Sequence, residues 1–273
     1  RTRRSGETPV MSSEKPIGVL DSGLGGLSVL RALVAKLPHE HFLYCSDNDN
    51  APWGDKDADY IIGRTRAMVA FLVGHGAKAV VLACNTATAV AADTLRREFS
   101  LPIIGIEPAV KPAAKLSPSG RFGVLGTTRT ITSERYHSLL VRFTQGTHVM
   151  SVAAPGLMEC VERGEFDTPK TKALLKKYLT PMLDAGIDTL VLACTHYPFL
   201  EKAIYEVAAR PLTIIEPSRA VADVLATRLK ENNLLNEGSE SVPVHFWIKG
   251  AKRFTPALKT LWPKASTIEE LTV

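Results

Sequence analysis

Short apolar runs alternate with amphipathic segments of helical length from Lys15 to about Lys230. Four or five apolar residues bounded by turn residues are typical of buried strands, whereas apolar residues spaced three and four apart indicate helices. Strands are expected at Ile17–Leu20, His41–Cys45 and Ala79–Ala83, and helices at Leu27–Leu37, Tyr60–His75 and Ala87–Phe99. This alternation predicts an α/β protein with mostly parallel sheets flanked by helices, in which ligands gather at the carboxyl ends of the strands.

The chain contains an internal repeat of short motifs at a nearly constant offset. The motif Gly18–Ser22 (GVLDS) has a counterpart 105 residues later in Gly123–Thr127 (GVLGT), and Ile106–Pro108 (IEP) recurs 109 residues later as Ile215–Pro217. Motifs that recur in the same order at one offset imply two copies of one fold. We therefore predict two similar α/β domains related by a pseudo-twofold axis, with the functional site in the cleft between them.

The repeat also suggests where the domains divide. The first domain is expected to span residues 16–100 and 211–273, and the second to span residues 101–210. After Glu237 the alternation breaks, because Val242–Ile248 is strand-like and Ile268–Val273 is interpreted as a tail. Residues 1–15 are predicted to be a disordered leader, with Met11 interpreted as the native start.

A cysteine forms the third part of the repeat. Val81–Thr86 (VLACNT) and Val191–His196 (VLACTH) each end an apolar run in a cysteine, and Cys84 and Cys194 lie 110 residues apart. A thiol between a strand and a helix faces free backbone N–H groups, which favour the thiolate and can lower a cysteine pKa from about 8.5 to roughly 3.5–7.5. A lone cysteine here would be interpreted as a small buried residue. Two cysteines in repeated sequence contexts favour a catalytic role for both.

Two opposed thiols suit the inversion of a carbon centre by proton transfer. One thiolate removes a proton from one face, the other thiol delivers a proton to the opposite face, and the roles exchange in the reverse direction. Three alternatives stay open. Cys84 and Cys194 could form a disulfide, although a reducing cytoplasm disfavours one. Cys194 and His196 could serve a hydrolase or decarboxylase-like enzyme, which leaves Cys84 without a purpose. A binding or regulatory protein is the third.

Two loops beyond predicted strands add candidate ligand groups. Asp21–Gly26 (DSGLGG) opens the first helix, and its glycines allow backbone N–H groups to approach an anion such as a carboxylate. Asp21 itself could cap that helix, contact a substrate ammonium group or tune a thiol. Pro52–Gly54 (PWG) follows the second strand and is expected at the mouth of the cleft. The glycine spacing does not fit a dinucleotide fingerprint.

Composition and charge limit the classes of partner and cofactor that the sequence predicts. The formal charge is +5, of which residues 1–10 carry +2, so the remaining +3 is a weak basic bias that makes nucleic-acid binding an unlikely function. No apolar run reaches the roughly 18 residues needed to cross a bilayer, and no apolar stretch follows the basic N-terminus, so a cytoplasmic location and no membrane partner are expected. The cysteines and histidines match no metal-ligand spacing, and no lysine is placed as the cysteines are, so neither a metal nor another cofactor is expected.

The motifs together resemble a known family. Asp21–Gly26, the Cys-Asn-Thr-Ala motif at Cys84 and the Cys-Thr-His-Tyr-Pro motif at Cys194, in this order, are similar to those of glutamate racemase in the aspartate/glutamate racemase superfamily. The resemblance covers about residues 16–230. It implies a cofactor-independent isomerase that interconverts L- and D-glutamate for peptidoglycan synthesis, usually as a homodimer. An aspartate or broad-specificity amino-acid racemase on the same scaffold is the nearest alternative.

The resemblance also implies roles for individual residues. Cys84 and Cys194 match the two catalytic cysteines. The substrate-binding pairs are matched by Asp21 and Ser22, Trp53 and Gly54, Asn85 and Thr86, and Thr195 and His196. Glu162 falls where the family has a supporting glutamate, although a solvated helix residue would fit that position equally well. The family usually has tyrosine where this chain has Trp53, so a side-chain contact there is in doubt, whereas a backbone contact would survive.

Overall fold

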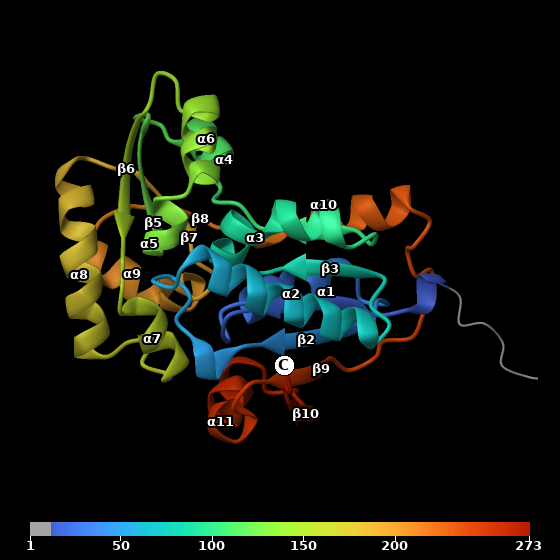
Figure 1. Ribbon diagram of the computed structural model, residues 1–273. Helices are drawn as coiled ribbons and strands as arrows, with labels where there is room; N and C mark the ends of the chain where they lie inside the picture. The colour runs from blue at the N-terminus through green and yellow to red at the C-terminus, as the bar shows by residue number, and fades with distance from the viewer. Residues whose placement is uncertain (1–11) are drawn as a thin grey trace, which may run out of the picture.

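Two parallel sheets form the framework of the computed structural model, which describes residues 12–273 (Figure 1). The six-stranded sheet has the order β10-β9-β2-β1-β3-β4, and the four-stranded sheet has the order β6-β5-β7-β8. Their strands are β1 (Ile17–Asp21), β2 (Phe42–Ser46), β3 (Ala79–Leu82), β4 (Ile103–Gly105), β5 (Arg121–Gly126), β6 (His148–Ala153), β7 (Thr189–Ala193), β8 (Thr213–Ile215), β9 (His245–Ile248) and β10 (Thr267–Glu270). The predicted α/β fold class is confirmed.

Helices flank both sheets and begin where the sequence pattern expects them. The α-helices are α1 (Leu27–Lys36), α2 (Ala58–Gly74), α3 (Asn85–Glu98), α4 (Val110–Leu116), α5 (Thr128–Ile131), α6 (Glu134–Phe143), α7 (Leu157–Glu162), α8 (Pro169–Asp184), α9 (Glu201–Ala208), α10 (Ser218–Glu231) and α11 (Ala251–Leu261). Three short 3-10 turns are η1 (Ser12–Glu14), η2 (Asn48–Asn50) and η3 (Tyr197–Leu200). The six elements predicted in the first hundred residues match β1, α1, β2, α2, β3 and α3 to within two residues at each end.

The sequence repeat corresponds to a repeat of topology. The run β2-β1-β3-β4 in the larger sheet has the same order as β6-β5-β7-β8 in the smaller one. Gly18 lies in β1 and Gly123 in β5, while Cys84 and Cys194 directly follow the equivalent strands β3 and β7. Strands β9 and β10 extend the larger sheet beyond β2. The two copies therefore bring their cysteines to equivalent ends of equivalent strands.

The domain boundaries differ from those predicted at residues 100 and 210. Strand β4 falls in the range assigned to the second domain but pairs with β3, and β8 falls in the range assigned to the first but pairs with β7. The chain passes from one sheet to the other only after β4 and again after β8. Helix α4, which follows β4, packs against the second sheet, and α10, which follows β8, packs against α1 of the first (Figure 1). Strands β4 and β8 are only three residues long, so their apolar runs give little indication of the strands with which they pair.

Both ends of the described chain differ from expectation. Ile268–Val273 was interpreted as a tail, yet β10 pairs with β9 in parallel, with Ile268 beside Phe246. Strand β10 (TIEE) has four residues and a single strongly apolar side chain, so it lacks the continuous apolar run that marks a central strand of a parallel sheet. Of the predicted disordered leader, residues 1–11 lie outside the described part of the chain, whereas Ser12–Glu14 form the turn η1.

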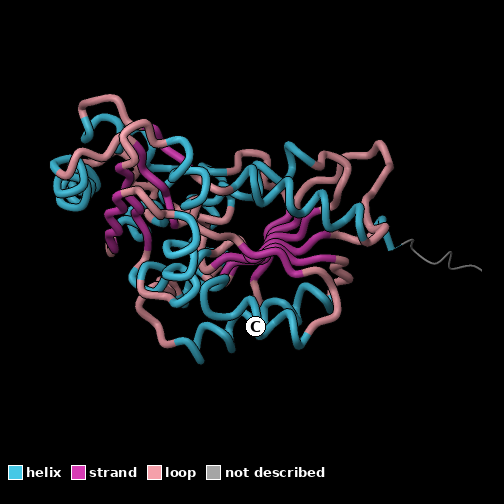
Figure 2. The backbone as a smooth tube through the Cα atoms, turned by 90° about the horizontal axis from the view of Figure 1, so that it is seen from above, coloured by secondary structure: helices cyan, strands magenta, loops and turns pink. Residues whose placement is uncertain are grey.

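The first sheet is buried on both faces by helices, which Figure 2 shows on either side of its strands. Side chains alternate across a strand, so Ile17 and Val19 enter the core under α1 and α10, while Leu20 enters the core under α2 and α3. All five residues of β1 and all four of β3 are buried. Near-continuous apolar strands of this kind are what a parallel sheet between two helical layers requires. Their rigidity fixes the loops at the carboxyl ends.

Candidate active site

A small cavity lies between the carboxyl ends of the two sheets. Both Cys84 and Cys194 line it, one from each copy of the repeat. The other predicted site residues in its wall are Ser22, Trp53, Gly54, Asn85, Thr86, Thr195 and His196. Asp21 and Glu162 are absent from the wall and contact its residues from behind. The structure therefore brings together the whole set that the sequence motifs selected.

Cys84 caps the N-terminus of α3 with its sulfur. The N–H of Ala87 donates to Sγ at 3.5 Å, and Sγ lies 3.7 Å from Oγ of Ser22. This geometry matches the predicted thiol at a helix N-terminus, but the predicted lowering of its pKa is wrong. Burial, followed by the nearby carboxyl of Asp21, raises the pKa of Cys84 far above its ordinary value and outweighs the Ala87 N–H. Cys84 is therefore a thiol in the unliganded protein.

Asp21 links the two halves of the site. Its Oδ2 accepts hydrogen bonds from the N–H of Gly26 at 2.7 Å and from Oγ1 of Thr195 at 3.3 Å. Its Oδ1 has no hydrogen-bond partner among the described residues. Burial raises the pKa of Asp21, while His196 and the backbone donors act in the opposite direction. Asp21 both caps the loop that opens α1 and reaches across to the residue beside Cys194.

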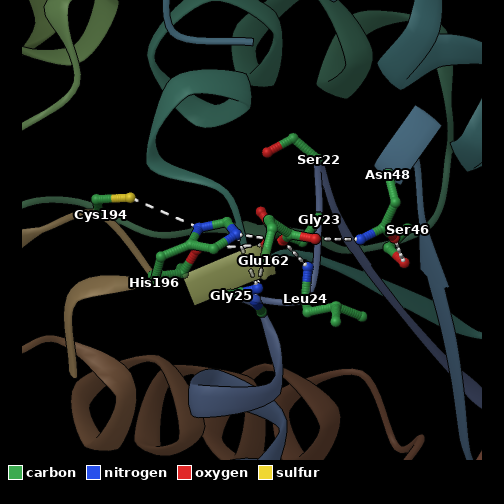
Figure 3. Close-up of polar contacts among 12 residues, drawn as sticks. Ser22, Gly23, Leu24, Gly25, Ser46, Asn48, Glu162, Cys194 and His196 are labelled. Atoms are coloured by element: carbon green, nitrogen blue, oxygen red, sulfur yellow. Dashed lines mark hydrogen bonds and ion pairs between the residues drawn. The ribbon is translucent and has the colours of Figure 1, made fainter. Parts of the chain in front are cut away.

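Cys194, His196 and Glu162 form a connected series on the other side of the cavity (Figure 3). Nδ1 of His196 lies 3.7 Å from Sγ of Cys194, and Nε2 lies 2.6 Å from Oε1 of Glu162. Burial would lower the pKa of His196, but hydrogen bonds to Cys194 and Glu162 raise that pKa well above its ordinary value. The imidazolium that results donates to the sulfur on one side and to the carboxylate on the other.

The backbone N–H groups of the glycine-rich loop Asp21–Gly26 bind side chains of the protein itself. It was expected to present N–H groups to an anionic ligand, yet Leu24 donates its N–H to Oε1 of Glu162 at 2.6 Å, and Gly26 donates to Asp21. A Cβ on Gly23 would lie 2.2 Å from Oε1 of Glu162. The N–H of Gly25 lies 3.2 Å from Nε2 of His196. Because the proton on Nε2 is directed to Glu162, this last contact is a close approach rather than a second hydrogen bond.

Several polar atoms at the cavity lack partners within the protein. Among the described residues, both Oδ1 and Nδ2 of Asn85 and Nε1 of Trp53 are buried without a hydrogen bond. Buried polar groups are rarely left unpaired, so such atoms in a cavity wall favour a polar ligand. Trp53 is 1% exposed and packs among apolar residues that include Leu20 and Ile61. The backbone of the next residue, Gly54, accepts a hydrogen bond from the N–H of Arg129 at 3.1 Å.

The sequence motifs missed wall residues contributed by the second copy of the repeat. Oγ1 of Thr127 lies 2.9 Å from Oγ1 of Thr86, which joins the two sides of the cavity, and Thr128 and Tyr197 also line it. One signal could have identified Thr127, because it occupies the position in GVLGT that Ser22 occupies in GVLDS. The hydroxyl is retained on both sides although the surrounding motifs differ.

The remaining expectations about cysteines and metals can be compared with residues 12–273. All four cysteines are buried free thiols, so the alternative of a Cys84–Cys194 disulfide is wrong. Cys45 and Cys160 are fully buried. No group of three or more histidine, cysteine or acidic side chains in the described residues is placed to hold a metal ion. Within the same residues, no helix is both long enough and apolar enough to span a membrane.

Comparison with known proteins finds relatives that match most of this chain. Residues 17–225 match the Asp/Glu/hydantoin racemase family. A glutamate racemase from Methylococcus capsulatus is 45% identical over 95% of this chain and 96% of its own length. One from Pseudomonas aeruginosa is 44% identical over 94% of this chain and 97% of its own length.

Solved structures extend the similarity to the fold. A glutamate racemase isoform from Bacillus anthracis matches with a TM-score of 0.87 at 33% identity, covering 96% of this chain and 98% of that one. Glutamate racemase from Escherichia coli, solved with L-glutamate and the activator UDP-MurNAc-Ala, matches with a TM-score of 0.84 at 30% identity, covering 95% of this chain and 99% of that one. This chain therefore belongs to the Asp/Glu/hydantoin racemase family as an amino-acid racemase, and its relatives there are glutamate racemases.

Proposed function

We propose that the protein interconverts L- and D-glutamate without a cofactor, by proton transfer at Cα between Cys84 and Cys194. One observation carries the proposal: two free thiols from equivalent positions of an internal repeat line one cavity. A racemase needs one proton-transferring group on each face of Cα, and the groups must exchange roles when the reaction reverses. A pair of identical side chains, one from each copy of the repeat, would meet that requirement if they lie on opposite sides of Cα.

The surroundings of the two sulfurs suggest how the reaction starts. Nδ1 of His196 lies 3.7 Å from Sγ of Cys194 and is placed to donate to that sulfur, while Cys84 carries its proton because burial and Asp21 raise its pKa. The Cys194 thiolate would take the proton from Cα, and the Cys84 thiol would donate its own proton to the opposite face. The turnover leaves Cys194 as the thiol and Cys84 as the thiolate, which is the state needed for the opposite enantiomer.

Substrate binding is proposed to use the polar groups that the protein leaves free. The amide of Asn85, in the cavity wall, can donate to a carboxylate and accept from an ammonium group. Ser22, Gly54, Thr86 and Thr195 also line the cavity, and Asp21 supports it from behind by accepting a hydrogen bond from Thr195. The preorganised donors would stabilise the negative charge that develops when Cα loses its proton.

The biological setting is proposed from the family resemblance. The D-glutamate formed would supply peptidoglycan synthesis, and the enzyme would act in the cytoplasm as a homodimer. The Escherichia coli relative was solved with L-glutamate, which supports glutamate as the substrate. Comparing turnover of D-glutamate and D-aspartate tests this assignment, because faster turnover of D-aspartate would identify an aspartate racemase instead.

Two substitutions and a solvent exchange test the reaction. Cys84→Ser and Cys194→Ser should each abolish racemisation, because either loss leaves one face of Cα without a proton-transferring thiol. In deuterium oxide, early product should carry deuterium at Cα while recovered substrate carries little, since the product receives its proton from the second group. Retained activity in both serine variants would refute the proposal, and loss in only one would favour a single-cysteine enzyme.

A further inference from the structure

Glu162 is held in place by Asn48, which lies in the turn after strand β2. Nδ2 of Asn48 donates to Oε2 of Glu162 at 2.6 Å, while Oε1 of the same carboxylate contacts Leu24 and His196 (Figure 3). Asn48 belongs to η2 after β2, and Glu162 ends α7 after β6, so the contact joins loops that follow equivalent strands of the two copies.

The orientation of the Asn48 amide is fixed by a second contact. Oγ of Ser46 donates to Oδ1 of Asn48 at 2.5 Å, and both residues are buried. An amide has a donor end and an acceptor end, so the hydroxyl on Oδ1 turns Nδ2 toward Glu162. A carboxylate requires donors, which makes this the only productive orientation of the amide.

The two carboxylate oxygens of Glu162 have different partners: Oε2 binds Asn48, and Oε1 binds His196 and Leu24. Nδ2 of Asn48 occupies Oε2, which leaves Oε1 directed at Nε2 of His196. The imidazolium in turn contacts Cys194. Charged groups facing His196 are Glu162, Asp21 and the Cys194 sulfur. Asn48 is not part of the cavity wall.

We propose that Asn48 is a positioning residue for the Cys194 half of the reaction, acting through Glu162 and His196 across the boundary between the two sheets. The inference rests on the proposed two-thiol racemisation and deepens it. Loss of a hydrogen bond to a charged group is worth a factor of about ten to a hundred, which sets the size of the expected effect. The effect should fall on kcat, because Asn48 does not line the cavity in which glutamate would bind.

Asn48→Ala and Asn50→Ala form a matched pair for the test. Asn50 lies in the same turn and donates to Oδ1 of Asp47 at 2.8 Å, without contacting Glu162. Asn48→Ala should lower kcat by about ten- to a hundredfold with KM for glutamate changed less than about twofold, whereas Asn50→Ala should change both less than about threefold. Ser46→Ala, which only frees the amide, should lower kcat in the same direction by a smaller factor.

A double variant separates positioning from general damage. If Asn48 acts through Glu162, adding Asn48→Ala to Glu162→Ala should lower kcat no further than Glu162→Ala alone. Losses that multiply would overturn the proposal, as would an Asn48→Ala enzyme that is as active as Asn50→Ala. Thermal unfolding of each variant checks that the fold is retained, and Ser46→Ala carries the test if Asn48→Ala does not fold.

A spectroscopic measurement makes the test independent of turnover. A proton held between Nε2 of His196 and Oε1 of Glu162 at 2.6 Å should give a strongly downfield proton NMR signal that is absent from a His196→Gln variant. The signal should persist in Asn50→Ala and weaken or move upfield in Asn48→Ala. An unchanged signal in Asn48→Ala contradicts the inference. A wild-type protein that does not racemise glutamate contradicts the proposed function, whatever the signal does.

Discussion

Gly25 lies directly against the imidazole of His196. A Cβ placed on Gly25 would lie 2.3 Å from Nδ1 and 2.6 Å from Cε1 of that ring. The glycine belongs to the loop after β1, and the histidine follows Cys194 in the second copy of the repeat, so the contact is made between the two sheets. Gly23 and Gly25 are therefore glycines because side chains of the other copy occupy the space that a Cβ would need.

Gly25→Ala should remove most of the racemase activity. A contact at 2.3 Å cannot be tolerated, so His196 must rotate away from Cys194 or the loop must shift. General acid–base groups contribute factors of about 10²–10⁴, and we expect kcat/KM to fall by an amount in that range. Steady-state racemisation, followed by circular dichroism or a coupled assay, measures the loss.

Gly63→Ala is the matched control for this substitution. Gly63 lies within α2, and a Cβ there would meet nothing within 4 Å. Alanine is the better helix former by up to about 1 kcal/mol, so this variant should be fully active and slightly more stable. Activity of Gly25→Ala equal to that of Gly63→Ala would show that the position of His196 against Gly25 is unimportant for catalysis.

Cys84 should resist alkylation near neutral pH. The thiolate is the nucleophile, and burial together with Asp21 raises the pKa of Cys84, so the reactive form is scarce in the unliganded protein. Asp21→Asn removes a negative charge beside the sulfur and should lower that pKa. We therefore expect iodoacetamide to label Cys84 faster in Asp21→Asn than in the wild type at pH 8, as measured by peptide mass spectrometry.

The label on Cys160 provides the internal reference for this experiment, because that thiol is buried elsewhere and should react equally in both proteins. An Asp21→Asn enzyme whose Cys84 labels more slowly than the wild type would reverse the sign of the expected effect. Such a result would mean that Asp21 favours the thiolate and would require a different starting protonation state.

The stability contribution of His196 should depend on pH with a definite sign. Its pKa is raised in the folded protein, while in the unfolded chain it is about 6.5. The contribution is therefore fully present below about pH 6.5 and is lost as the pH rises through the folded value. Urea unfolding of wild type and His196→Gln between pH 6 and pH 9 should show a difference in unfolding free energy that shrinks with rising pH. A difference that grows with pH would contradict the imidazolium assignment.

Much of the fold could be read from the sequence because its strongest signals are local. Apolar runs of four or five residues predicted the positions of β1, β2 and β3, and the repeated motifs predicted two copies of one topology. Strands β4 and β8, with three residues each, gave too little pattern to reveal their partners. Which sheet a short strand joins depends on neighbours distant in the chain, and only packing decides that.

The residues of the site could be predicted from the sequence, whereas the hydrogen bonds among them could not. The motifs placed Cys84 and Cys194 together, yet they gave no indication that Glu162 would reach the glycine loop over a separation of 138 residues. The sequence predicts a lowered pKa for Cys84 and the structure raises it, for a related reason. The helix N-terminus is visible in sequence, whereas burial and the proximity of Asp21 arise only when the two sheets meet.

The central claim is that the two sulfurs act on opposite faces of one carbon. A crystal structure with glutamate bound tests this most directly. We expect Cα of glutamate between the two sulfurs, with Sγ of Cys84 on one side and Sγ of Cys194 on the other, each at roughly the 3–3.5 Å separation of reacting atoms, slightly lengthened for sulfur. Both sulfurs on one side of Cα, or one of them far from it, would contradict the two-thiol reaction.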